Sequence, residues 1–333
     1  MSGAAGRPLV LEVAGLATEF STRAGTLKAV DGVSLTLGRG EIMGLVGESG
    51  SGKSVTGYSI MGLVEPPGRI VAGSVKVAGT ELVGLSREAL RQVRGARIAM
   101  VFQDPMMTLN PVLTVGEQMI LALRAHARIP PRTALVQARE ALAVVGIPSP
   151  EARLAAYPHQ LSGGMRQRVA IAMALMHRPD VVIADEPTTA LDVSIQSQIL
   201  AEVKRLAGAL GTAFLWITHD LAVVSALADR IAIMYAGRIV EEGPAEAVIA
   251  VPRHPYTHGL LASVPAGSAP GSRLPQIDGQ APAPINLPDG CRFRPRCARA
   301  DAACGAMPTA TVDDGLMRSF LCHHPLAQLA GGR

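Results

Sequence analysis

The feature that constrains this chain most is one octapeptide, Gly47-Glu48-Ser49-Gly50-Ser51-Gly52-Lys53-Ser54, which lies between an apolar run and a helical pattern. It fits G-x-x-x-x-G-K-S/T, whose glycines let backbone N–H groups close around phosphate oxygens at a helix N-terminus. In that pattern Lys53 neutralises the β- and γ-phosphates, and the Ser54 hydroxyl coordinates Mg²⁺. The sequence therefore predicts that residues 47–54 bind ATP with Mg²⁺.

A second segment, Val181 to Glu186, consists of four apolar residues followed by two acids, Asp185 and Glu186. Such a run is typical of a buried parallel strand that carries acids at its carboxyl end. We predict that Asp185 holds Mg²⁺ and that Glu186 orients or deprotonates the attacking water. Because adjacent residues of a strand point to opposite faces, we expect different roles for the two acids.

Hydrophobic periodicity predicts strands that alternate with helices around a mainly helical middle segment. Strands are expected at 9–13, 33–37, 41–46, 97–102, 181–184, 213–217 and 231–235, and helices at 53–63, 87–93, 115–127, 133–145, 164–176, 194–209 and 221–227. Alternation of this kind favours a parallel sheet with crossover helices. The expected fold is an α/β P-loop NTPase with a mainly parallel core sheet, an N-terminal antiparallel β subdomain and an inserted helical subdomain.

Composition excludes some classes of protein. No apolar run reaches the roughly 18 residues of a membrane span, and residues 1–15 lack a signal-peptide layout, so we expect a cytosolic protein. The 31 Lys and Arg residues outnumber the 27 acids only slightly and are scattered, and aromatic residues make up 3%. We therefore expect no nucleic-acid partner.

The class of NTPase is narrowed by a further octapeptide, Leu161-Ser162-Gly163-Gly164-Met165-Arg166-Gln167-Arg168. Ser162 is a good helix N-cap, and the two glycines would let another molecule approach the first helical turn. The octapeptide resembles the signature of ABC transporter ATPases, with Met165 where Gln is commoner. The resemblance implies a dimer that sandwiches two ATP molecules, in which Ser162, Gly163 and Gly164 complete the nucleotide site of the facing subunit.

The same resemblance assigns roles to residues that would be uninformative alone. Gln103, after the strand at 97–102, matches the glutamine that senses the γ-phosphate and the attacking water, and it is expected among the Mg²⁺ ligands. His219 matches the histidine that contacts the γ-phosphate. Residues 190–192 resemble a dimer-contacting loop. Phe20 is the candidate for stacking on adenine, with a place in the core as the alternative.

The C-terminal part resembles that of ATPase subunits of dipeptide, oligopeptide and nickel importers. The resemblance rests on residues 253–265 and on four cysteines, Cys291, Cys297, Cys304 and Cys322. In a reducing compartment such thiolates favour a metal over disulfides, and their spacings leave zinc and iron–sulfur open. The resemblance favours a 4Fe–4S cluster over Zn²⁺ or no metal. We expect the Pro-rich residues 264–290 to be irregular, and we expect the metal centre to stabilise the C-terminal segment by cross-linking it.

Together these patterns predict the ATPase motor of a di- or oligopeptide importer, a peripheral protein on the cytoplasmic side of the membrane. Its implied partners are a second ABC ATPase subunit, with a paralogous heterodimer favoured, two transmembrane permease subunits, and indirectly an extracytoplasmic substrate-binding protein. Nickel or another small solute is the alternative cargo, and a non-transport ABC ATPase or a non-catalytic subunit the alternative class. The predicted domains are the ATP-binding core at 1–85 and 179–250, the helical subdomain at 86–178 and the C-terminal extension at 251–333.

Overall fold

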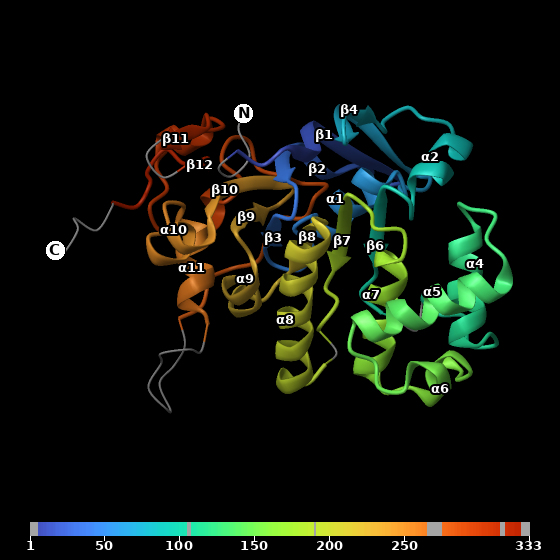
Figure 1. The fold of residues 1–333 in the computed structure, drawn as a ribbon. Helices are drawn as coiled ribbons and strands as arrows, with labels where there is room; N and C mark the ends of the chain where they lie inside the picture. Colours follow the sequence, from blue (N-terminus) through green and yellow to red (C-terminus); the bar gives the residue numbers. More distant parts are fainter. Residues whose placement is uncertain (1–5, 105–107, 190, 265–274, 314–316, 328–333) are drawn as a thin grey trace. The chain divides into compact units, whose positions relative to one another are not determined.

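The computed structural model describes residues 6–104, 108–189, 191–264, 275–313 and 317–327 (Figure 1). The chain divides into two compact units. The first comprises Met1–Glu12, Thr36–Ile42 and Lys76–Trp216, and the second comprises Val13–Leu35, Met43–Val75 and Ile217–Arg333. Among the described residues, no helix combines the length and hydropathy that crossing a membrane requires.

The first unit contains three neighbouring strands in the order β8-β7-β6. β6 and β7 pair in parallel, with Ile98 opposite Val181 and Val101 opposite Ala184, and all of β7 is buried. This confirms the parallel pairing expected from the βα alternation. The elements of this unit are β5 (Thr80–Glu81), α2 (Arg87–Val93), β6 (Ile98–Val101), α4 (Val115–Arg124), α5 (Pro131–Val144), α6 (Pro150–Leu154), η2 (Pro158–Gln160), α7 (Gly163–Leu175), β7 (Val181–Asp185), α8 (Val193–Leu210) and most of β8 (Ala213–Thr218).

Helices α4 to α7 gather in one cluster of the first unit (Figure 1). The first of them begins in a capping box: the Glu117 backbone N–H donates to the Thr114 hydroxyl, and Thr114 N–H donates to the Glu117 carboxylate. The buried residues Met119 and Leu123 lie on the inner face of α4, and Ala138 and Leu142 on that of α5. The expected helical segment between β6 and β7 is therefore present.

The second unit contains five neighbouring strands in the order β11-β12-β10-β9-β3. β3 and β9 pair in parallel, whereas β9 with β10, β10 with β12 and β12 with β11 are antiparallel. The elements are most of β1 (Leu9–Thr22), β2 (Gly25–Gly38), β3 (Ile42–Val46) and β4 (Gly68–Val77), with α1 (Lys53–Met61), α9 (Leu221–Leu227), β9 (Arg230–Tyr235), β10 (Arg238–Pro244), α10 (Ala245–Ala250), α11 (Pro255–Ala262), η3 (Arg294–Arg296), η4 (Ala302–Gly305), β11 (Thr311–Asp313) and β12 (Arg318–Phe320).

The C-terminal extension is more ordered than its composition suggests. Residues 275–290 are irregular as expected, and residues 265–274 of the Pro-rich stretch lie outside the described part of the chain. Beyond them, however, β12 pairs with β10 and extends the sheet of the second unit. Strands of three residues carry too little periodicity to be recognised in sequence.

A buried ion pair joins this extension to β10. Arg318 of β12 contacts Glu241, and both side chains are 0% exposed. Glu241 also accepts hydrogen bonds from the backbone N–H groups of Arg253 and His254, at 2.8 and 2.9 Å. The carboxylate therefore contacts both β12 and the residues that lead into α11.

Candidate nucleotide site and cysteine cluster

Residues 47–54, the predicted phosphate-binding loop, connect β3 to α1, as expected from the sequence. Two of its glycines are required by close contacts with the backbone. A Cβ atom on Gly47 would lie 2.1 Å from the carbonyl oxygen of Met234, and one on Gly52, at φ +105°, would lie 2.3 Å from that of Ala29. No side chain fits at either position without moving the backbone.

Lys53 opens helix α1 and is 4% exposed. Its Nζ donates hydrogen bonds to the carbonyl oxygens of Gly47, at 2.8 Å, and Glu48, at 3.0 Å. The loop therefore wraps around the Lys53 ammonium group. This group gives the loop a positive charge that favours the binding of an anion. Ser54 lies beside Lys53 in the first turn of α1.

Asp185 is the last residue of β7 and is 1% exposed, whereas Glu186 lies just beyond the strand at φ +45°. The expectation that strand alternation separates the two acids was wrong, because Glu186 adopts the left-handed region instead of continuing the pleat. That conformation costs a non-glycine residue about 1–3 kcal/mol and is most often retained where function needs it. The two acids therefore do not alternate along one strand.

Side chains of Gln103 and Thr189 contact the Glu186 carboxylate. Gln103, which follows β6, donates from Nε2 to Glu186 Oε2 at 3.3 Å, and the Thr189 hydroxyl donates to the same oxygen at 3.1 Å. The structure thus brings together Gln103 and Glu186, which the sequence assigned to one reaction. Asp185, Glu186, Gln103 and the Ser162 segment belong to the first unit, and the phosphate-binding loop, His219 and Phe20 belong to the second.

The signature segment begins α7. Ser162 is the N-cap, and its hydroxyl accepts a hydrogen bond from Met165 N–H at 3.3 Å, as predicted. The two glycines differ in how much space surrounds them, a difference that the sequence did not indicate. A Cβ atom on Gly164 would lie 2.6 Å from Cγ2 of Ile195 in α8, whereas one on Gly163 would make an ordinary 3.6 Å contact with Leu191. Packing against Ile195 therefore requires a glycine at position 164, whereas Ser162 and Gly163 are exposed.

His219 and Phe20 both belong to the second unit, His219 in a connection and Phe20 in a strand. His219 is exposed between β8 and α9, next to the Asp220 N-cap of that helix. Phe20 in β1 is half-buried, and its ring lies so close to Gly68 that a Cβ atom there would be 2.5 Å from Cε1. Of the predicted dimer loop, Leu191 and Asp192 are described, and Asp192 caps α8; Ala190 lies outside the described residues.

The four cysteines line one cavity, although they are spread over residues 291–322. None forms a disulfide; Cys304 is buried and the other three are half-buried. Burial raises the pKa of Cys322 to about 11 and also raises that of Cys291, and the neighbouring thiols add to both shifts. Four thiols that line one cavity are a donor set suited to a thiophilic cation, which replaces the thiol protons on binding.

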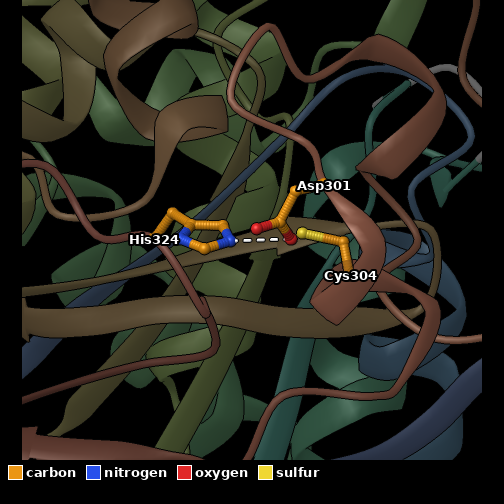
Figure 2. Close-up of side chains that lie close together, drawn as sticks. All are labelled: Asp301, Cys304 and His324. Carbon is orange, nitrogen blue, oxygen red and sulfur yellow. Dashed lines mark ion pairs between the residues drawn. The ribbon is translucent and has the colours of Figure 1, made fainter.

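Two residues that the sequence analysis did not propose lie beside Cys304. The side chains of Asp301 and His324 point toward it, and one ligand atom from each of the three residues lies within 4.8 Å of the others (Figure 2). His324 Nε2 and Asp301 Oδ1 form an ion pair at 2.9 Å. The only sequence signal was the position of His324 two residues after Cys322, and nothing marked Asp301.

Comparison with known proteins agrees with this description. Residues 30–189 match the family model described as ABC transporter, and residues 240–304 match the oligopeptide/dipeptide transporter C-terminal region. The dipeptide transport ATP-binding protein DppD of Haemophilus influenzae is 46% identical over 317 residues, which cover 95% of this chain and 96% of that protein. A putative peptide import ATP-binding protein of Brucella abortus is 49% identical over 322 residues, which cover 92% and 95%.

Solved structures give the same family. The ATP-binding cassette MJ0796, in a dimeric post-hydrolysis state with ADP and Pi, has a TM-score of 0.64 and 29% identity, covering 71% of this chain and 98% of that one. CbiO1 of Clostridium perfringens, part of an ABC transporter complex, has a TM-score of 0.63 and 28% identity, covering 73% and 91%. The chain therefore belongs to the ABC transporter family of ATP-hydrolysing cassettes, in the branch that carries the oligopeptide/dipeptide transporter C-terminal region.

Proposed function

We propose that this protein is the ATPase motor of an importer for dipeptides or oligopeptides, bound peripherally at the cytoplasmic face of the membrane. The observation that carries the proposal is that one chain matches both the ABC transporter family model and the oligopeptide/dipeptide transporter C-terminal region. Relatives that match along nearly their whole length are named for dipeptide transport and peptide import. Peptide cargo is therefore favoured over nickel or another small solute.

Each site residue has a proposed role in hydrolysis. Residues 47–54 bind the phosphates through backbone N–H groups and the Lys53 ammonium, and His219 contacts the γ-phosphate. Ser54, Gln103 and Asp185 would hold Mg²⁺, which neutralises charge on the β- and γ-phosphates. Gln103 orients the attacking water and Glu186 accepts a proton from it, while the water oxygen forms a bond to the γ-phosphorus. The bond from the γ-phosphorus to the ADP oxygen breaks with its electron pair going to ADP, which leaves inorganic phosphate. Phe20 is proposed to stack on adenine.

We propose that the working unit is a dimer, with Ser162, Gly163 and Gly164 of one cassette facing the nucleotide of the other. The exposure of Ser162 and Gly163 supports this role. A paralogous cassette is the favoured partner. ATP binding would close the dimer, and the helical subdomain, residues 86–178, would pass the motion from the core at 1–85 and 179–250 to two permease subunits.

For the extension at 251–333 we propose a metal centre held by Cys291, Cys297, Cys304 and Cys322. A 4Fe–4S cluster is favoured and Zn²⁺ is the alternative, with Asp301 and His324 as nearby oxygen and nitrogen donors. Arg294 and Arg299 line the same cavity and would offset the negative charge of four thiolates, whereas Arg292 and Arg296 pair with Asp31 and Glu48. The centre would hold a segment whose prolines prevent it from building a core of its own.

The transport proposal is tested in membranes that contain the cassettes, the permeases and a substrate-binding protein. ATP turnover is measured with a dipeptide, an oligopeptide or Ni²⁺ supplied with the corresponding binding protein. Stimulation by peptides but not by Ni²⁺ is expected. Stimulation by Ni²⁺ alone would replace peptide by metal as the cargo, and no dependence on any binding protein would contradict a role in import. A complex with Glu186→Gln cassettes measures the background.

A further inference from the structure

Glu48, the second residue of the phosphate-binding loop, is held by two residues of the C-terminal extension. Arg296 donates from Nη1 to Glu48 Oε2 at 2.7 Å and from Nη2 to Glu48 Oε1 at 3.0 Å, which is a bidentate pair. The Glu48 backbone N–H donates to the hydroxyl of Tyr256 at 2.9 Å. Side chain and backbone of one loop residue are thus both held from outside the loop.

Arg296 is also held in place by residues other than Glu48. Its side chain is 5% exposed, and its Nε donates to the carbonyl oxygen of Asp278 at 3.0 Å. The guanidinium carbon lies 5.8 Å from the ring centre of Tyr235 and 6.0 Å from that of Phe293. A planar guanidinium fixed in this way loses little freedom when it binds a carboxylate, so its position determines that of Glu48.

Tyr256 is equally fixed. It is 0% exposed in α11, and its ring packs against Tyr235 and Phe293 with centroid distances of 4.5 and 5.4 Å. His254 caps this helix, because its Nδ1 accepts a hydrogen bond from Tyr256 N–H at 3.0 Å. Burial lowers the pKa of His254 to about 4, so the ring is neutral at physiological pH and remains an acceptor.

A second connection runs through the turn between β9 and β10. Arg292 donates to the carbonyl oxygen of Ala236 and pairs with Asp31. The next residue of that turn, Gly237, donates from its backbone N–H to the carbonyl oxygen of Ser51 at 2.8 Å. The extension therefore supports the loop at Ser51 as well as at Glu48, and both arginines directly neighbour cysteines of the cluster.

We propose that the C-terminal extension is a working part of the nucleotide site, with Arg296 and Tyr256 as positioning residues of the phosphate-binding loop. The proposal rests on the proposed binding of phosphate by residues 47–54. A loop carboxylate disfavours the binding of a phosphate chain unless its charge is neutralised, and Arg296 supplies the opposite charge. The same contacts align the loop N–H groups before the ligand arrives, which reduces the cost of binding.

The test measures the Kd for MgADP of the full-length protein by calorimetry. Arg296→Gln leaves the Glu48 carboxylate uncompensated and is expected to weaken binding roughly 10-fold. In the Glu48→Gln/Arg296→Gln double variant neither group is charged, so most of that affinity should return. A residue that only stabilised the fold would not be rescued in this way. Tyr256→Phe removes one hydroxyl and should weaken binding by roughly 2- to 5-fold.

The matched control is Arg91→Gln. Arg91 also forms a bidentate pair with a glutamate, Glu88, but on the exposed surface of α2, so MgADP affinity should not change. Wild-type affinity in both Arg296→Gln and Tyr256→Phe would overturn the proposal, as would a loss in Arg296→Gln that Glu48→Gln does not restore. Lys53→Ala separates this failure from a wrong phosphate site: unchanged affinity in Lys53→Ala would mean that residues 47–54 do not bind phosphate at all.

Discussion

Gln103 donates a hydrogen bond from Nε2 to Oε2 of Glu186, at 3.3 Å, and so connects the segment after β6 to the end of β7. Glu186 has a left-handed backbone conformation, and its carboxylate lies next to the Gln103 amide. This arrangement is suited to hold and activate one water molecule.

Glu186→Gln is therefore expected to keep MgATP affinity but to slow phosphate release by roughly 10²- to 10⁴-fold, because an amide cannot accept the proton. The variant should also accumulate as an ATP-bound closed dimer, which size-exclusion chromatography with ATP would detect. Glu202→Gln in α8 is the control and should hydrolyse ATP at the wild-type rate. Wild-type turnover in Glu186→Gln would mean that another residue is the base.

The buried pair of Arg318 and Glu241 predicts a large effect on stability. In Arg318→Met the Glu241 carboxylate stays buried without its opposite charge, and the free energy of unfolding should fall by about 3–5 kcal/mol. Chemical denaturation measures this. Glu88→Gln removes one partner of an exposed ion pair on α2 and should leave the denaturation midpoint unchanged. Equal midpoints for all three proteins would contradict the buried pair.

The two signature glycines should respond differently to alanine. Gly164→Ala places a methyl group against Ile195 and should destabilise the protein by about 1–3 kcal/mol, with recovery in Gly164→Ala/Ile195→Ala because the obstructing methyl is then removed. Gly163→Ala should keep its stability and lose ATP-dependent dimerisation. Thermal unfolding and light scattering with ATP separate the two effects. If Gly163→Ala dimerised normally with ATP, Gly163 would have no close contact with the partner.

The cysteine cavity predicts one metal centre per chain. Protein purified without oxygen should contain either about four Fe with sulfide or one Zn, as measured by elemental analysis. Cys304→Ser should lose this metal. His324→Gln should retain it if the four thiolates are the ligands. Loss of metal in His324→Gln with retention in Cys297→Ser would instead assign the site to Asp301, Cys304 and His324 (Figure 2).

What the sequence alone determined is the part that depends on contiguous residues. The loop at 47–54, the Ser162 cap, the buried β7 and most helices of the first unit follow from local patterns, because hydrogen bonds within a helix and the pleat of a strand act over a few positions. The family followed from the same short segments. Only the tertiary structure showed the left-handed Glu186, the packing role of Gly164 and the strands β10 to β12.

The contacts between the loop and the extension also depended on tertiary structure. Glu48 and Arg296 are 248 positions apart, and Arg318 and Glu241 are 77 apart. Nothing in the sequence near Glu48 indicates which of the chain's arginines will reach it, since a pair of charges has no periodicity. Arg296 reaches Glu48 because the segment that contains it packs against α11 through the buried rings of Phe293 and Tyr256.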